Sequence, residues 1–288
     1  MNNDFDLLIG TGLDGPYIQS VINNALEEDV GSGDVTTEAC INGCIEVGAR
    51  LVSRQEGVLA GGVIAAMVFH TLDKSMSCKI VVNEGDRITH GDEIGFFHGS
   101  VNTLLTGERV ALNLVQRMSG IATETARYIA KVADTGVTIL DTRKTMPGLR
   151  KLDKYSVRIG GGTNHRFGLF DAVLVKDNHI RAAGGLNSAV NNILKTRSDG
   201  LPIQVECDTL KQLEECIALG VDLVLLDNMG VNDLRKAVEL TAGRARLEAS
   251  GGITLENVRE IAETGVDFIS IGAITHSVMA LDIGLDFD

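Results

Sequence analysis

The stretch that decides the fold is IQVECDTLKQLEECIALGVDLVLLD, residues 203–227. A short apolar run is followed by Glu206, an amphipathic segment comes next, and a second apolar run is followed by Asp227. The two runs are predicted to be strands, and the segment between them a helix that stops near Gly220. Because both runs are apolar at nearly every position, they indicate strands buried on both faces, as in a parallel sheet covered by helices.

The same alternation recurs from Val137 to Gly272. Its apolar runs are VTIL, AVLV, IQV, LVLL, RL and FISI, and helix-patterned segments lie between them. Repeated βα units predict a parallel sheet. With one more strand hidden in the glycine-rich stretch 159–166, the pattern favours an α/β barrel of about seven strands over a doubly wound open sheet.

The chain before residue 105 has a different pattern of apolar and polar residues. Residues 17–30 have a helical pattern, while 45–62 and 77–100 read as short strands with glycine turns. We therefore predict an N-terminal α+β domain over residues 1–112, joined by the C-terminal tail 277–288, and a barrel domain over 113–276. The helical residues 106–133 are predicted to connect the two.

Composition excludes several classes of function. No apolar run reaches the roughly 18–20 residues that a membrane span needs. The net charge of −13 opposes binding to nucleic acid or to an anionic membrane, because both need a broad basic face. The five cysteines are scattered and include no CxxC pair, which is typical of reduced thiols and does not complete a zinc site. The start of the chain has no export signal, so we expect a cytoplasmic protein.

Charged residues gather at the predicted strand ends. Arg143 and Lys144 follow the first strand, Lys176 follows another, and Glu206 and Asp227 follow two more. In a parallel α/β barrel the carboxyl ends of the strands form the ligand-binding face, so these residues are expected around one pocket. Residues 143–176 hold eight basic and two acidic side chains, which indicates an anionic ligand.

Position separates these basic residues into two groups. Arg150, Lys151, Lys154 and Arg158 fall at helical spacing, for which a solvated helix face is at least as good an interpretation as a ligand patch. Arg143, Lys144, Arg166 and Lys176 stand instead at strand ends or in glycine-rich loops.

Two kinds of anion site are indicated. Arg166 follows Gly160–Gly162, and a guanidinium in such a loop can hold a carboxylate through two parallel hydrogen bonds. The adjacent His165 could instead be a turn histidine that caps a carbonyl. Ser250, Gly251 and Gly252 after one late strand, and Gly272 after the next, are typical of a phosphate site.

Together these motifs resemble the quinolinate phosphoribosyltransferase family. The resemblance covers nearly the whole chain and rests on the stretches EDVGSGDVTT, GERVALNLVQRMSGIAT, DTRKTMPGLR, GGGTNHRFGLFD, VLVKDNHI, VECD, LLDN, EASGGI and ISIGAITHS. It implies an N-terminal α/β sandwich, an incomplete α/β barrel and a homodimer with shared active sites, with hexamers in some members. The implied reaction joins quinolinate to phosphoribosyl pyrophosphate (PRPP), releases pyrophosphate and carbon dioxide, and leaves nicotinate mononucleotide for NAD biosynthesis.

The resemblance also implies roles for individual residues. Quinolinate would be held by Arg143, His165, Arg166 and, from the neighbouring subunit, Arg109. Lys144 and Lys176 would lie near both substrates. Glu206 and Asp227 would face the ribose and a Mg²⁺ ion, and the 5′-phosphate would be bound by Ser250, Gly251, Gly252, Gly272 and His276. Met146 and Cys207 depart from residues common in the family, which leaves local packing and substrate fit open.

Three rival interpretations stay open. A relative within the same fold could act on nicotinate or on another aromatic acid. Nicotinate has only one carboxylate, for which several arginines are superfluous. A barrel aldolase would use Lys144 or Lys176 as a Schiff-base amine, which borohydride trapping would reveal. A non-catalytic sensor of phosphorylated ligands would show no turnover.

Overall fold

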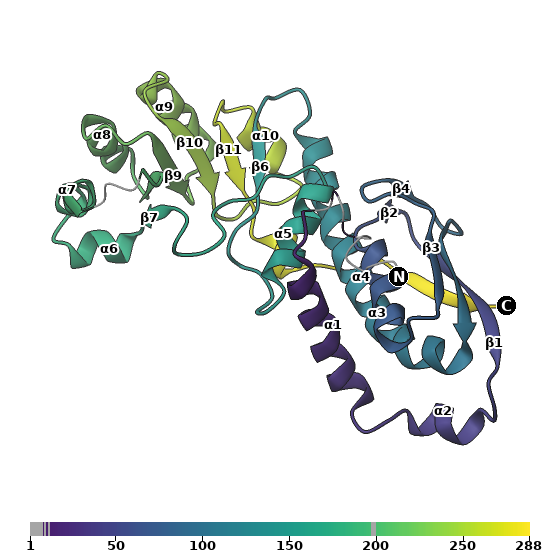
Figure 1. Cartoon of the computed structure of the whole chain (residues 1–288). Helices are drawn as coiled ribbons and strands as arrows, with labels where there is room; N and C mark the ends of the chain where they lie inside the picture. The colour runs from purple at the N-terminus through teal and green to yellow at the C-terminus, as the bar shows by residue number, and fades with distance from the viewer. Residues whose placement is uncertain (1–7, 9, 11, 197–199) are drawn as a thin grey trace. The chain divides into compact units, whose positions relative to one another are not determined.

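The computed structural model describes residues 8, 10, 12–196 and 200–288. These residues form two compact units, which are coloured along the chain in Figure 1. The first takes Met1–Ala126, Thr145–Gly161 and Ser277–Asp288, and the second takes Arg127–Lys144 and Gly162–His276. The predicted domain boundary after residue 112 stays a prediction, and helix α4 (Val101–Lys131) passes this position without a break.

The second unit is built on one six-stranded parallel sheet. Its strands, in spatial order, are β6 (Thr138–Leu140), β11 (Phe268–Ser270), β10 (Arg246–Ser250), β9 (Leu223–Asp227), β8 (Ile203–Cys207) and β7 (Val173–Val175). Thr163 adds an isolated parallel bridge to Leu140 at the outer side of β6. The seventh strand expected from the glycine-rich stretch is thus reduced to one bridge in the described part of the chain.

This strand order is that of a barrel and not of a doubly wound sheet. Strands β7 to β11 lie side by side in the order in which they occur in the chain. The first strand of the unit, β6, pairs with the last, β11. A doubly wound sheet would reverse direction part-way along the chain. The opening lies between Thr163 and β7, since no pairing joins them in the described residues, so the prediction of an incomplete α/β barrel is confirmed.

The stretch 203–227 shows why the units form as they do. Thr209 accepts a hydrogen bond from the backbone N–H of Gln212, and Gln212 Oε1 accepts one from the N–H of Thr209, which fixes the start of α8 (Leu210–Ala218). Leu213 and Cys216 are the buried face of this helix. Gly220, at φ +72°, lets the chain turn into β9.

The other helices of this unit follow the strands as the alternation predicts. They are α6 (Asp177–Ala182), α7 (Leu186–Thr196), α9 (Val231–Thr241), α10 (Val258–Ala262) and α11 (Ala273–His276). Within the described residues no helix is both long enough and apolar enough to cross a membrane.

The first unit has a four-stranded antiparallel sheet in the order β12 (Ile283–Phe287), β1 (Glu46–Ser53), β5 (Glu93–Ser100) and β3 (Ser77–Ile80), with a small pair of β2 (Gly57–Val58) and β4 (Arg87–Ile88). Its helices are α1 (Gly15–Val30), α2 (Val35–Cys40), α3 (Gly62–Leu72), α5 (Arg150–Ile159) and most of α4. Strand β12 pairs with β1, so the C-terminal tail belongs to this sheet. Phe69 of α3 packs on Phe97 of β5, with ring centroids 4.9 Å apart.

Helix α5 differs from the solvated face that its spacing suggested. Arg158 is exposed, but Lys154 is only 3% exposed and its neighbour Asp153 is fully buried. The interpretation as a simple solvated face is therefore wrong for Lys154. Periodicity predicts which residues share a helix face, but tertiary packing decides how much of that face is covered.

Asp153 holds a buried ion pair. Its carboxylate accepts hydrogen bonds from Arg117 Nε at 3.0 Å and Arg117 Nη2 at 2.8 Å, so α4 and α5 are joined by a two-point contact. Removing one member of a buried ion pair leaves the other charge unpaired, which costs about 3–5 kcal/mol.

We expect Asp153→Ala to lower the free energy of unfolding by about 3–5 kcal/mol in urea denaturation, because Arg117 loses two charge-assisted hydrogen bonds and the N–H of Met146 loses its acceptor. Asp14→Ala is the matched control, since Asp14 pairs with Lys151 on the surface and such pairs contribute about 1 kcal/mol at most. Similar small losses in both variants would contradict a stabilising role for the buried pair.

Candidate active site

A cavity of about 590 Å³ lies at the carboxyl ends of the parallel strands. It is lined by Thr142, Arg143, Lys144, His165, Arg166, Leu174, Lys176, Glu206, Leu225, Asp227, Asn228, Glu248, Ser250, Gly251, Gly252 and Ser270. Four of these side chains are basic and three are acidic, so the cavity is highly charged. Its volume suits a small-molecule ligand.

The lining follows the two-residue period of the strands. Residues two apart on a strand point to the same face, and the cavity is lined by such pairs: Leu225 with Asp227 and Glu248 with Ser250. Parallel pairing aligns Leu225 with Glu248 and Asp227 with Ser250. The inward residues of neighbouring strands therefore meet in layers at one end of the barrel.

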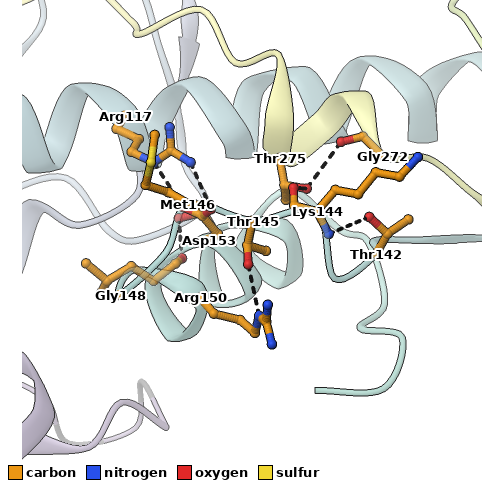
Figure 2. A network of polar contacts seen from close by, with 12 residues as sticks. Arg117, Thr142, Lys144, Thr145, Met146, Gly148, Arg150, Asp153, Gly272 and Thr275 are labelled. Carbon is orange, nitrogen blue, oxygen red and sulfur yellow. Dashed lines mark hydrogen bonds and ion pairs between the residues drawn. The ribbon is translucent and has the colours of Figure 1, made fainter. Parts of the chain in front are cut away.

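The loop after β6 is held by backbone contacts, which Figure 2 shows. The N–H of Lys144 donates to Thr142 Oγ1 at 3.0 Å, and the carbonyl of Lys144 accepts a hydrogen bond from Thr275 Oγ1 at 2.8 Å. A Cβ on Gly272 would lie 3.0 Å from Lys144 Cδ, so glycine there leaves room for the lysine stem. Lys144 is thereby fixed at the cavity wall.

The next residues of this loop, Thr145 and Met146, belong to the first unit and form hydrogen bonds within it. The N–H of Met146 donates to Asp153 Oδ2 at 3.0 Å, and Arg150 Nε donates to Thr145 Oγ1 at 2.9 Å (Figure 2). The carboxylate that pairs with Arg117 therefore also orders the backbone just after Lys144. This gives Asp153 a second structural use.

Two guanidinium groups converge on the cavity. Burial, and then the positive charge of Arg143, lower the pKa of Arg166. Arg166 Nη1 donates to the carbonyl of Ala172 at 3.1 Å, which fixes part of the guanidinium. Two cations that sense each other in a partly buried site create a strong preference for an anion.

A buried carboxylate orders the loop that carries Arg166. Asp141, fully buried at the end of β6, accepts hydrogen bonds from Asn164 Nδ2 at 2.7 Å and from the N–H of His165 at 2.8 Å. Farther along, Asp171 accepts from the N–H groups of Phe167 and Gly168, and its pKa is lowered even though burial acts to raise it. The loop is therefore anchored on both sides of Arg166.

The ring of His165 is engaged at both nitrogens. Nδ1 accepts the N–H of Arg166 at 2.7 Å, and Nε2 lies 3.1 Å from Gln204 Oε1 and 3.4 Å from Glu248 Oε2. Gln204 Nε2 donates in turn to Glu248 Oε2 at 2.7 Å. Burial acts to raise the pKa of Glu248, but the bonds from His165 and Gln204 help to hold it below its ordinary value.

The remaining acids lie at the ends of β8 and β9. Lys176 Nζ donates to Glu206 Oε2, and Asn228 Nδ2 donates to Asp227 Oδ2 at 2.7 Å. Among the described residues no group of three or more His, Cys, Asp or Glu side chains is arranged to hold a metal ion. Glu206 and Asp227 can nevertheless supply the one or two carboxylates with which Mg²⁺ commonly binds beside substrate phosphates.

The glycine-rich turn after β10 requires glycine at Gly251. Its φ is +92°, and a Cβ there would lie 2.1 Å from Asn228 Oδ1. Gly252, at φ +61°, has nothing within 4 Å of such a Cβ. Helix α10 begins only at Val258, so the N–H groups beside the cavity at this turn come from the loop and not from a helix start.

Comparison with known proteins agrees with this architecture. Sequence models of the quinolinate phosphoribosyl transferase N-terminal and C-terminal domains match residues 34–119 and 121–286. The chain belongs to the quinolinate phosphoribosyltransferase family.

Curated relatives and a solved structure extend the match. A Bacillus subtilis protein named "Probable nicotinate-nucleotide pyrophosphorylase [carboxylating]" is 43% identical over 93% of both chains. A Synechocystis protein with the same name is 47% identical over 88% of this chain and 86% of its own. The crystal structure of a nicotinate-nucleotide pyrophosphorylase from Ehrlichia chaffeensis is 40% identical and covers 96% of this chain and all of its own, with a TM-score of 0.92.

In this family member the structure brings together most of the predicted site residues. Those that line the cavity are Arg143, Lys144, His165, Arg166, Lys176, Glu206, Asp227, Ser250, Gly251 and Gly252. Gly272 and His276 do not line it, but Gly272 lies beside Lys144. Arg109 is exposed on α4 in the first unit and is not among the lining residues.

Sequence reasoning missed a layer of polar residues below these strand ends. Gln204 and Glu248 were not assigned a role, although Gln204 stands two residues before Glu206 and Glu248 two before Ser250. The two-residue period of a strand was the available signal, because it places Gln204 on the same face as Glu206 and Glu248 on the same face as Ser250.

We expect Gly251→Ala to cost more stability than Gly252→Ala in urea denaturation. Both replacements place alanine at positive φ, which costs about 1–2 kcal/mol, but only the first also drives a methyl group into Asn228. The extra loss at Gly251 should reach about 1–3 kcal/mol, typical of an overpacked site. Equal losses would show that the turn adjusts freely.

Proposed function

We propose that this chain is a quinolinate phosphoribosyltransferase. It transfers the phosphoribosyl group of PRPP to quinolinate with decarboxylation, giving nicotinate mononucleotide, pyrophosphate and carbon dioxide in NAD biosynthesis. Membership of the family and the names of its relatives support this reaction. The structural observation that carries it is the convergence of Arg143 and Arg166 on one cavity, close enough for one charge to lower the pKa of the other.

Quinolinate carries two carboxylates on adjacent ring carbons. In the proposal Arg143, His165 and Arg166 form the cradle for them, with Arg109 of a neighbouring subunit. Each charge-assisted hydrogen bond contributes about 1.5–3 kcal/mol, so two guanidinium groups can hold a dicarboxylate in competition with water. Nicotinate has one carboxylate and would leave part of this positive charge unmatched.

Transfer begins when the pyridine nitrogen attacks the anomeric carbon of the ribose and pyrophosphate leaves. Positive charge grows on the ribose ring, and Glu206 and Asp227 stabilise it from the cavity wall. Lys144 and Lys176 offset the charge of the ring carboxylates and of the departing pyrophosphate. Once the nitrogen is quaternary, its positive charge stabilises the electron pair left on the adjacent ring carbon when the carboxylate there leaves as carbon dioxide. That carbon then takes up a proton, which gives nicotinate mononucleotide.

A Mg²⁺ ion fits this arrangement as a cofactor. Glu206 and Asp227 would hold it, and when bound it neutralises charge on the pyrophosphate oxygens. The 5′-phosphate of PRPP is assigned to Ser250, Gly251 and Gly252, with Gly272 and His276 nearby. Open backbone N–H groups in a glycine-rich turn provide the donors that such a phosphate needs.

The proposed assembly is a homodimer with shared active sites, which hexamers could extend. Exposure of Arg109 on α4 is compatible with its reaching a neighbouring subunit's site. A cytoplasmic location is supported by the five cysteines, all of which are free thiols.

The aldolase alternative would use Lys144 or Lys176 as the Schiff-base amine. The geometry weighs against Lys176, because its Nζ is engaged by the Glu206 carboxylate.

Incubation with quinolinate, PRPP and Mg²⁺ should yield nicotinate mononucleotide and carbon dioxide in equal amounts. Chromatography measures the mononucleotide, and release of label from carboxyl-labelled quinolinate measures the carbon dioxide. Nicotinate in place of quinolinate should give little or no turnover. A preference for nicotinate, or no product from either acid, would reject the proposed function.

Arg143→Ala and Arg166→Ala should each lower kcat/KM, and the loss should correspond to more than about 2 kcal/mol of transition-state stabilisation. Each variant removes charge-assisted bonds to a substrate carboxylate. Arg235→Ala is the control, since Arg235 is exposed on α9 away from the cavity lining. Near-wild-type kinetics in both site variants, with folding verified by circular dichroism, would refute the cradle.

If each active site contains residues of two subunits, two inactive variants should complement each other when they are mixed. Arg109→Ala and Lys144→Ala proteins should each be nearly inactive, and mixing them should restore part of the activity, because a hybrid dimer would contain one intact site. Absence of recovery after verified subunit exchange would count against a site shared between subunits.

A further inference from the structure

We propose that Glu248 and Gln204 are positioning residues that act through His165 to hold Arg166 in place for the quinolinate carboxylate. This inference rests on the proposed function, since it assigns residues to the same site. It follows from the order of donors and acceptors in a chain of hydrogen bonds beneath the cavity.

The first step is the backbone of Arg166. Its N–H donates to His165 Nδ1 at 2.7 Å, so this nitrogen must carry a lone pair and no proton. A neutral imidazole with an unprotonated Nδ1 carries its proton on Nε2. The hydrogen-bond pattern therefore assigns His165 as the neutral Nε2–H tautomer.

The second step is the acceptor for that proton. Nε2 lies 3.1 Å from Gln204 Oε1, which accepts it, and the amide nitrogen of Gln204 donates to Glu248 Oε2 at 2.7 Å. Every bond in this chain runs in one direction and ends on a carboxylate. Gln204 and Glu248 are 3% and 1% exposed, so water cannot readily replace either partner.

The third step is the consequence for substrate binding. Both nitrogens of His165 bond within the protein, so the ring contributes to the proposed cradle by ordering Arg166. Asp141 fixes the N–H of the same histidine from β6 at 2.8 Å. Arg166 therefore directly follows a residue that is held from three sides. His165 contacts Asp141 just after β6, Gln204 of β8 and Glu248 of β10.

The lowered pKa of Glu248 agrees with this role. Burial alone would raise it, and the hydrogen bond from the Gln204 amide acts in the opposite direction. An ionised carboxylate at the end of the chain is the acceptor that the Gln204 amide needs. A protonated carboxyl group at Glu248 would present a donor to the amide N–H of Gln204, which needs an acceptor.

The test uses two variants of the full-length protein. Gln204→Met keeps the side-chain length and removes the acceptor of the His165 proton. It should raise the KM for quinolinate about tenfold or more, the loss expected for a displaced charge-assisted bond, and change the KM for PRPP less than about threefold. Unchanged quinolinate KM, or equal rises for both substrates, would overturn the proposal.

The double variant Gln204→Met/Glu248→Met separates positioning from stability. The single variant leaves a buried carboxylate without its amide partner, whereas replacing both residues removes the unpaired charge, so thermal stability should recover at least in part. The quinolinate KM should stay raised, because His165 still lacks its acceptor. Return of the KM to the wild-type value together with stability would show that the chain is only structural.

Two further measurements complete the design. Thr241→Val is the control for losing a buried polar group, because Thr241 Oγ1 on α9 has no hydrogen-bond partner among the described residues. It should leave both KM values unchanged, and a selective rise in the quinolinate KM in this variant would contradict the specificity claimed for Gln204.

Nitrogen-15 NMR of histidine-labelled protein reads the tautomer directly, with His165→Asn used to assign the signal. Wild type should show a protonated Nε2 and a bare Nδ1, and Gln204→Met should show a mixture of tautomers. A protonated Nδ1 in the wild type would overturn the proposal. Absence of wild-type turnover would instead reject the proposed function, while the NMR result still decides the hydrogen-bond chain.

Discussion

Three buried carboxylates hold the segments that carry the cationic side chains, and the site depends on them. Asp141 binds the backbone at Asn164 and His165, Asp153 binds the backbone of Met146, and Glu248 reaches His165 through Gln204. Burying a carboxylate is costly unless it is paired or well hydrogen-bonded. Asp141 and Asp153 accept hydrogen bonds from backbone N–H groups of the loops that they order, and Glu248 accepts one from the side-chain amide of Gln204.

This arrangement explains how an acidic protein gathers basic side chains in one pocket. The chain has a net charge of −13, yet four basic side chains line one cavity. Burial, and after it the positive charge of Arg143, lower the pKa of Arg166, so the two guanidinium groups repel each other within the site. Hydrogen bonds to Asp141 and Asp171 hold the loop that carries Arg166 in spite of that repulsion. A dianionic ligand then gains from charge that is already in position, because little ordering of side chains is left to its binding.

Much of the fold was readable because it rests on local patterns. The alternation of apolar runs with helical segments predicted the barrel, and β6 beside β11 confirmed it over a doubly wound sheet. Strand ends also predicted the lining residues Arg143, Lys176 and Asp227, since parallel strands must end at the same face. Burial of Lys154 was not readable, because helical spacing gives the face of a residue but not what covers that face.

By itself the sequence determined the βα repeat, the family, and the residue types gathered at the strand ends, since these follow from periodicity and from motifs contiguous in the chain. Only the tertiary structure decided that Gln204 and Glu248 meet the ring of His165, that Asp153 binds both Arg117 and the backbone of Met146, and that Gly251 must leave room for Asn228. The physical reason is that hydrogen bonds and close contacts depend on positions in space. Pairs 39 to 44 residues apart carry no mutual signal in one sequence until the strands are in register.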